Sequence, residues 1–259
     1  MLRFGDVCSV AHRNFEHSGF LNSPEAPTAG HQVRSGGTRY IFASPGRAFS
    51  RGLRVEQRYS ANVATALHRS LDVGRAPTRE VMFRSVLQLW FHEIAPAQWW
   101  KVDPEFDRQI AERFGEIHSQ AARAELFEWR TEPRGRLAEV IVLDQFSRNI
   151  FRGNRRAFEA DALALALAQE AVSASADTAL TQDERVFLYM PYMHSESKKI
   201  HAVAERLFRE NAPKSNHDFE LRHKAIIDRF GRYPHRNAAL GRDSTPDELA
   251  FLAEPGSSF

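Results

Sequence analysis

Helix start signals recur along the last two thirds of this chain and leave little room for β-strands. Thr181-Gln182-Asp183-Glu184 and Thr245-Pro246-Asp247-Glu248 both have the spacing of a capping box, in which threonine and glutamate satisfy backbone N–H groups reciprocally. Asp103 followed by Pro104 places an acid at an N-cap and a proline at the first helical residue. No segment there alternates apolar and polar residues over the length of a strand. The sequence therefore predicts an all-α fold, an antiparallel helical array joined by short loops.

Prolines and glycines mark the ends of the predicted helices. Pro191 removes a helical hydrogen bond, so the helix that opens after Thr181 is expected to kink or stop there. Gly231 suits the left-handed conformation that often ends a helix, and Pro234 prevents its continuation. The helices are expected at residues 79–93, 104–122, 134–151, 155–174, 182–193, 196–210 and 217–230, with a further one opening at Thr245.

Positive charge is concentrated in the first 76 residues. Residues 1–76 hold ten arginines, no lysine and five acids, whereas residues 77–259 carry 25 basic and 28 acidic side chains. The second part is thus slightly acidic, which removes the electrostatic drive for broad nucleic-acid binding, and no nucleic-acid partner is expected. We predict an all-helical domain at residues 77–259. Residues 1–76 are expected to be a disordered extension or the product of a misplaced start codon, and organelle targeting is the less favoured alternative.

The residue inventory also limits the chemistry. A single cysteine, Cys8, excludes an intrachain disulfide and a cysteine-rich zinc site. His201 and Glu205 have i, i+4 spacing, but a complete metal-ligand motif, a glycine-rich phosphate loop and a dinucleotide fingerprint are all missing from the sequence. No apolar run is long enough to span a bilayer. We therefore expect a soluble, cytoplasmic protein with no membrane partner and no metal or other cofactor. The sequence does not set its oligomeric state.

The first candidate site lies within the predicted helix at residues 134–151. Asp144 and Arg148 are four residues apart on a helix face that is otherwise apolar, and Asn149 and Arg152 follow directly. A buried acid and a buried arginine at this spacing can neutralise each other. Two interpretations stay open: a core ion pair that holds helices in register, or the polar wall of a pocket.

The second candidate site follows Pro191, where a helix exit is expected to expose His194, Ser195 and Glu196. His194 is predicted to transfer protons or to donate to an anion, and Glu196 is its expected catalytic partner. Ser195 is not predicted to be a nucleophile activated by His194, because the side chains of adjacent residues diverge. It is expected instead to cap the following helix.

The third candidate site is the short loop after Gly231. Arg232, His235, Arg236 and Asn237 lie within six residues of each other there. Cations near a helix C-terminus complement the helix dipole, which explains some of them. The number exceeds that need, so we predict that these side chains bind the carboxylate or phosphate of a ligand.

The motifs occur in an order that resembles the domain of unknown function 924 family. The matching stretches are Leu89-Trp90-Phe91, Trp99-Trp100-Lys101-Val102-Asp103-Pro104-Glu105-Phe106-Asp107, Leu143-Asp144-Gln145-Phe146-Ser147-Arg148-Asn149, Met190-Pro191-Tyr192-Met193-His194-Ser195-Glu196 and Arg229-Phe230-Gly231-Arg232-Tyr233-Pro234-His235-Arg236-Asn237. The resemblance covers about residues 80–259. It implies a tetratricopeptide-like all-helical fold and no established reaction.

Two functional hypotheses follow from these features. The first is a polar pocket that binds a small anionic ligand, with or without acting on it. The second is a tetratricopeptide-like scaffold that grips a protein partner, in which the polar motifs have only structural roles. The sequence contains no clear tetratricopeptide repeat signature, which favours the first hypothesis.

Overall fold

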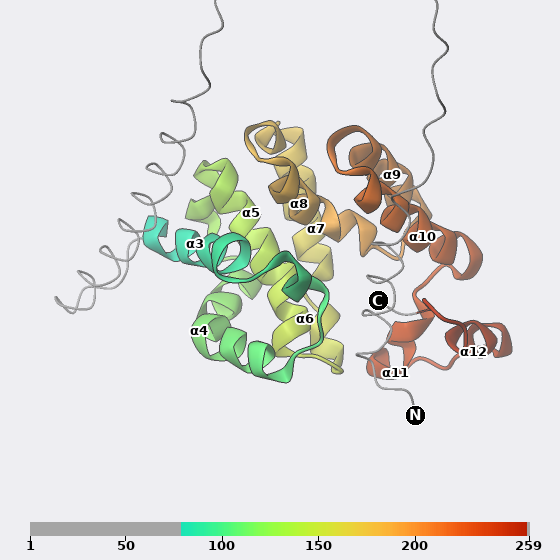
Figure 1. Cartoon of the computed structure of the whole chain (residues 1–259). Coiled ribbons are helices and arrows are strands. Elements are labelled where there is room, and N and C mark those ends of the chain that lie inside the picture. The colour runs from blue at the N-terminus through green and yellow to red at the C-terminus, as the bar shows by residue number, and fades with distance from the viewer. Residues whose placement is uncertain (1–78, 258–259) are drawn as a thin grey trace, which may run out of the picture. The chain divides into compact units, whose positions relative to one another are not determined.

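A computed structural model describes residues 79–257, and the regular structure in this part of the chain is helical (Figure 1). No strand occurs among these residues, which confirms the all-α class. The tetratricopeptide-like arrangement and the domain boundary at residue 77 stay predictions. The predicted N-terminal extension, residues 1–76, lies outside the described residues.

The helical segments follow one another through short connections. In chain order they are α3 (Arg79–Gln88), η1 (Leu89–Glu93), η2 (Pro96–Trp100), α4 (Pro104–Ala122), η3 (Phe127–Thr131), α5 (Pro133–Ile141), η4 (Val142–Phe146), α6 (Ser147–Ile150), η5 (Arg155–Phe158), α7 (Asp161–Ser173), η6 (Ala176–Ala179), α8 (Gln182–Met193), α9 (Lys198–Asn211), α10 (Lys214–Phe230), η7 (Pro234–Arg236), α11 (Asn237–Leu240) and α12 (Pro246–Leu252). The segments η1 and η4 are π-helical, and the other η segments are 3-10 helices. Over the described range, no helix has the length and apolar character that crossing a membrane requires.

The hydrophobic core is built around α5, which packs against α3, α7 and α8 (Figure 1). Leu137, Val140 and Ile141 of α5 are fully buried. Ala164 and Ala168 of α7 are fully buried too, one helical turn apart, and their small side chains let the neighbouring helices approach closely. Removing each large aliphatic side chain of α5 from water contributes about 1.5 to 3 kcal/mol to stability.

The C-terminal helices add sequentially to this core and return the chain to the end of α8. The helix α9 packs against both α8 and α10. Gly231 ends α10 in the left-handed conformation with φ of 71°, as predicted, and the chain then reverses. Tyr233 is fully buried in this return loop, and its hydroxyl donates to the Met193 carbonyl at 2.5 Å. The loop that holds η7 is thereby fixed against the exit of α8.

The helix caps predicted at Asp103, Thr181 and Thr245 are confirmed. The prediction that Ser195 caps the following helix is wrong, because the N-cap residue of α9 is Ser197. Both capping boxes are complete, at Thr181 with Glu184 and at Thr245 with Glu248. The Asp103 side chain accepts from the backbone N–H groups of the first turn of α4. Loss of one such cap costs about 1 kcal/mol.

The predicted continuous helix at residues 134–151 is instead interrupted by a π-helical turn, η4. Side chains supplement the main-chain hydrogen bonds at this wider turn. The Ser147 hydroxyl donates to the Leu143 carbonyl at 2.5 Å, and Arg148 donates to the Asp144 carbonyl at 2.7 Å. Because π turns frequently occur at functional sites, the position of Asp144 within η4 is informative.

Other helix boundaries also differ from the predicted ones. The predicted segment 155–174 divides into η5 and α7. The helix α8 has the predicted bounds, Gln182–Met193, but it does not stop at Pro191, and His194 is its C-cap. The helix α9 starts at Lys198 and not at residue 196, and the backbone of Ser197 before it is extended. The helix α10 starts at Lys214, directly after Pro213, and not at residue 217.

Candidate functional site

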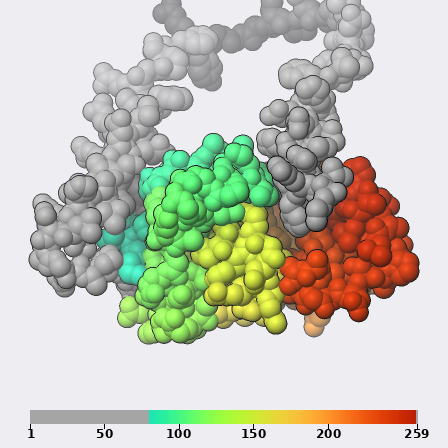
Figure 2. Space-filling view, turned by 90° about the horizontal axis from the view of Figure 1, so that it is seen from below, coloured from blue at the N-terminus to red at the C-terminus, as the bar shows by residue number. Residues whose placement is uncertain are grey.

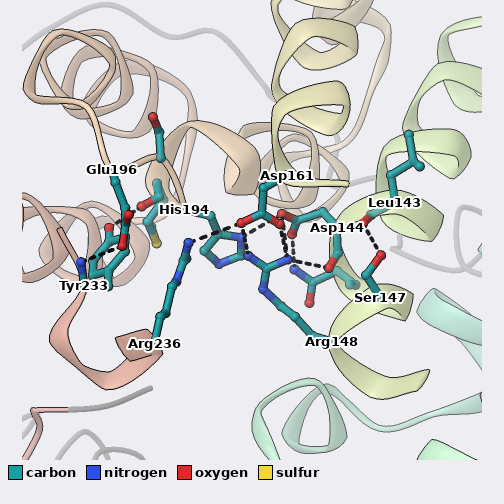
Figure 3. A network of polar contacts seen from close by, with 12 residues as sticks. Leu143, Asp144, Ser147, Arg148, Asp161, His194, Glu196, Tyr233 and Arg236 are labelled. Carbon is teal, nitrogen blue, oxygen red and sulfur yellow. Dashed lines mark hydrogen bonds and ion pairs between the residues drawn. The ribbon is translucent and has the colours of Figure 1, made fainter. Parts of the chain in front are cut away.

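Asp144 and His194 form a hydrogen-bonded pair between η4 and the end of α8 (Figure 3). The Asp144 carboxylate is almost fully buried, and its Oδ1 lies 2.8 Å from His194 Nδ1. Its Oδ2 accepts from the Gln145 side chain at 2.6 Å. Both carboxylate oxygens are therefore occupied, and the imidazole orientation is fixed by an acid on a different helical segment.

Arg148 joins this pair to a second carboxylate. Its Nη1 and Nη2 donate to the two oxygens of Asp161, each at 3.0 Å, and its Nη1 lies 3.3 Å from Asp144 Oδ1. The sequence-based ion pair of Asp144 with Arg148 is thus present, but Arg148 also binds an acid at the start of α7. Nothing in the sequence singles out Asp161, because an acid in the first turn of a helix is explained by the helix dipole.

Arg236 approaches the same carboxylate from the C-terminal loop. Its side chain is only 6% exposed, and its Nη1 donates to Asp161 Oδ2 at 3.2 Å. The guanidinium lies between two rings, 4.8 Å from the Phe158 centroid and 4.5 Å from that of Tyr233. Within residues 79–257, the buried Arg236 Nε has no hydrogen-bond partner. Arg236 is therefore buried without full pairing.

Segments far apart in the sequence meet at this cluster. Figure 2 shows a face on which the yellow surface, near residues 150–160, lies against the red C-terminal segment. The bond between Asp161 and Arg236 links the same two parts of the chain. His194 and Asp161 remain partly exposed, at 13% and 21% of their side-chain surface, so solvent reaches the edge of the cluster.

The electrostatics of the cluster hold the acid ionised and the imidazoles neutral. Burial opposes ionisation of Asp144, but the charge of Arg148 and the contact with His194 together lower its pKa below the usual range. Burial, and then the charge of Arg148, lower the pKa of His194. Burial and the neighbouring Arg236 lower the pKa of His235 to about 3. Near neutral pH, His194 thus donates its Nδ1–H to Asp144 and carries a lone pair on Nε2.

Glu196, the predicted catalytic partner of His194, makes different contacts. Its carboxylate binds Arg242 through two bonds of 2.6 and 2.9 Å and accepts from the Tyr233 backbone N–H at 2.8 Å. Burial opposes its ionisation, yet the hydrogen bond from Arg242 lowers its pKa. No hydrogen bond joins Glu196 to His194 in the part of the chain that is described. The contacts of Glu196 fix the return loop.

Four further predicted ligand-binding residues pair with other acids. Asn149 and Arg152 both bind Asp107 of α4, at distances of 2.6 to 2.8 Å. Arg232 and Asn237 both contact Glu248 of α12. Asn149, Arg152, Arg232 and Asn237 therefore lie outside the cluster. The predicted residues that the structure brings together around Asp161 are Asp144, Arg148, His194, His235 and Arg236.

A buried hydrogen-bond network centred on His201 holds Tyr233, whose ring contacts Arg236 of the cluster. His201 Nδ1 lies 2.7 Å from Glu220 Oε1, and His201 Nε2 lies 2.9 Å from the Ser195 carbonyl oxygen and 3.1 Å from the Tyr233 hydroxyl. Burial raises the pKa of Glu220, against the opposing effect of its hydrogen bond with His201. Tyr233 in turn carries the ring against which Arg236 packs. The i, i+4 spacing in the sequence pointed to Glu205 as the partner of His201, whereas the structure pairs His201 with Glu220.

The measured cavity and the metal-ligand geometry point to no other site. A cavity of about 300 Å³ lies at the start of α4, lined by residues that include Glu93, Gln98 and Asp103, and it contains none of the predicted site residues. Across the described residues, no three potential metal-ligating side chains converge.

Comparisons with known proteins agree with the sequence motifs. The family described as bacterial protein of unknown function (DUF924) matches residues 86–256. A solved structure of a protein of unknown function from Agrobacterium tumefaciens is 34% identical and superimposes with a TM-score of 0.65. The match covers 68% of this chain and 99% of that one. Among curated proteins, none matches the chain.

Proposed function

We propose that this chain, which belongs to the domain of unknown function 924 family, binds a small anionic ligand through Arg236, with His194 as a proton acceptor beside it. The observation that carries the proposal is the incomplete pairing of Arg236. Its guanidinium is almost fully buried, yet only Nη1 has a hydrogen-bond partner among residues 79–257. A buried donor without a partner costs about 1 to 3 kcal/mol, and an anion at the Nε and Nη2 edge removes that cost.

The protein itself shows how this edge holds a carboxylate. Arg130 donates from Nε and Nη2 to the two oxygens of Glu139, each at 2.7 Å. Arg152 and Arg232 bind Asp107 and Glu248 in the same manner. Parallel N–H donors match the two oxygens of a carboxylate or phosphate, so the open edge of Arg236 is suited to the same kind of partner supplied by a ligand.

His194 adds proton chemistry to this anion site. Its Nδ1 is held by Asp144, and burial together with Arg148 favours the neutral imidazole. Neutral histidine with an oriented ring accepts a proton at Nε2, which is the arrangement of a general base. Arg236 is among the positive charges that act on His194, so an anion bound to Arg236 favours protonation of the ring. Anion binding and proton uptake are therefore coupled in this proposal.

The proposal is tested by ligand-induced stabilisation of the full chain. We expect the melting temperature to rise with at least one member of a panel of acetate, propionate, citrate and inorganic phosphate at constant ionic strength. The variant Arg236→Met removes the open edge and is expected to weaken that response at least about tenfold in ligand concentration, the effect of losing one charged hydrogen bond. His194→Asn is expected to weaken the pH dependence of binding and leave part of the affinity.

Arg152→Met is the matched control, because Arg152 uses the same guanidinium edge to bind Asp107 of the protein itself. Its anion response should equal that of the wild type. A folded wild type that responds to no anion, or a response that is equal in wild type and Arg236→Met, contradicts the proposal.

A further inference from the structure

We infer that the anion of this site is a small monocarboxylate and not a phosphate ester. The inference rests on the proposed function, because it specifies the ligand class of the same site. It is carried by two observations: the charge balance of the buried cluster, and the number of guanidinium edges that have no protein partner among the described residues.

The charged side chains around Arg236 already balance. The groups that act on it or on its neighbours His194 and His235 comprise three arginines and three carboxylates, Arg148, Arg236, Arg242, Asp144, Asp161 and Glu196. The two imidazoles are neutral near pH 7, since burial lowers the pKa of each. These side chains therefore carry no net charge, and each negative charge brought among them must be compensated locally or held at a high cost.

One negative charge can be compensated, and two cannot. His194 takes up one proton at Nε2 and becomes an imidazolium, which Asp144 stabilises through Nδ1. This restores neutrality when the ligand carries one charge. A phosphate monoester near pH 7 carries between one and two charges, and its second charge meets two carboxylates, Asp144 and Asp161, that are already in the cluster. The balance therefore favours a monoanion.

The guanidinium donors that have no protein partner also favour a monocarboxylate. Arg148 uses both terminal nitrogens on Asp161 and Asp144. Arg242 uses both of its own on Glu196, so among residues 79–257 its buried Nε is a single donor without a partner and not a two-donor edge. The first turn of α7 cannot cradle an anion, because Asp161 occupies it. The Nε and Nη2 edge of Arg236 thus offers two parallel donors, enough for the two oxygens of a carboxylate. A phosphate needs partners for three, and phosphate sites use additional donors.

The test compares propionate with methyl phosphate by calorimetry at pH 7.5 and constant ionic strength, on the full chain. We expect propionate to bind at least about tenfold more tightly, one log unit in the dissociation constant. Measurements in two buffers of different ionisation enthalpy should show uptake of a proton with propionate. Arg236→Met should abolish propionate binding, and Arg236→Lys, which keeps the charge in the cluster but loses the fork, should weaken it at least about tenfold.

The outcomes separate the inference from the proposed function. Tighter binding of methyl phosphate that still depends on Arg236 overturns the monocarboxylate inference and leaves the anion site standing. Binding of neither ligand, or binding that is unchanged in both Arg236 variants, overturns both. Circular dichroism of Arg236→Lys confirms that a lost signal reflects the site and not unfolding.

Discussion

Arg232 and Arg236 lie four residues apart in one loop, and the structure pairs them very differently. Arg232 donates from Nε and Nη2 to both oxygens of Glu248, at 2.6 and 2.8 Å, although its side chain is 29% exposed. Arg236 is 6% exposed and holds one oxygen of Asp161 at 3.2 Å, an acid that already binds Arg148 through both oxygens. The more deeply buried arginine is therefore the less completely paired one.

In the proposed function, this difference separates a structural arginine, Arg232, from a binding arginine, Arg236. Stability alone favours full pairing where water is most excluded, because an uncompensated buried charge is costly. Burial, followed by the charge of Arg148, lowers the pKa of Arg236, whereas the hydrogen bond with Glu248 raises that of Arg232. Incomplete pairing at the more deeply buried position of the loop is what the proposed binding role of Arg236 predicts.

The largest expected effect comes from breaking the centre of the cluster. Arg148→Met leaves Asp144 and Asp161 without their shared partner, and Asp144 is almost fully buried. Because an unpaired buried charge is strongly destabilising, we expect the free energy of unfolding to fall by about 3 kcal/mol in denaturant titrations at pH 7. Arg155→Met, which removes an exposed pair with Glu159, is the control and should cost less than about 0.5 kcal/mol. Equal losses in the two variants contradict the assigned role of Arg148.

A smaller effect is expected from the pH dependence of His235. Burial lowers its pKa from an ordinary 6.5 to about 3 in the folded protein. Below pH 6.5 the unfolded chain therefore binds a proton that the folded protein does not, and stability is lost as the pH falls toward 3. His235→Gln should reduce the slope of unfolding free energy between pH 6.5 and 5 by up to about 1 kcal/mol per pH unit.

His92 offers the control for that measurement. It lies in η1, and its replacement by glutamine should leave the slope unchanged, because it is exposed. If His235→Gln retains the wild-type slope, then burial of this imidazole beside Arg236 does not set the acid sensitivity of the fold.

Features that depend on residues close together in the sequence were predicted, and features that depend on tertiary contacts were not. The caps at Asp103, Thr181 and Thr245 depend on residues within one turn, so their spacing alone identified them. The π turn at Asp144 was not predictable from periodicity, because side-chain bonds from Ser147 and Arg148 contribute to it. Boundaries that depend on tertiary contacts are the ones that the sequence misplaced.

The candidate site divides in the same way. The sequence identified the cations of the loop after Gly231 but could not separate Arg232 from Arg236, since both have the same local surroundings. What separates them is the acid that each one meets, Glu248 or Asp161, and those acids come from other helices. The density of arginines in the sequence identified the loop after Gly231 as a candidate site. Which acid pairs with which arginine depends on the tertiary fold.

The last prediction compares the unfolding free energies of variants at the two arginines, and the change at Arg236 is expected to be small. Arg236→Met removes a charge that burial opposes, and Asp161 keeps both of its bonds to Arg148. We therefore expect the free energy of unfolding to change by less than about 1 kcal/mol in either direction, as for replacement of poorly paired buried ions by apolar side chains. Arg232→Met, at the more exposed position, should cost more than Arg236→Met, because the buried Glu248 loses both bonds to the guanidinium and, among the described residues, keeps only those to Thr245 and Asn237.

The order of these two losses is the decisive quantity, because burial alone predicts the reverse. Chemical denaturation of the two variants at pH 7, without added organic anions, measures it directly. A larger loss for Arg236→Met than for Arg232→Met means that Arg236 is fully engaged in holding the fold, and an open edge for a ligand is then ruled out. A near-zero loss together with lost anion stabilisation assigns the residue to binding, since a side chain that contributes little to folding has then been kept buried for the contacts that it makes with a ligand.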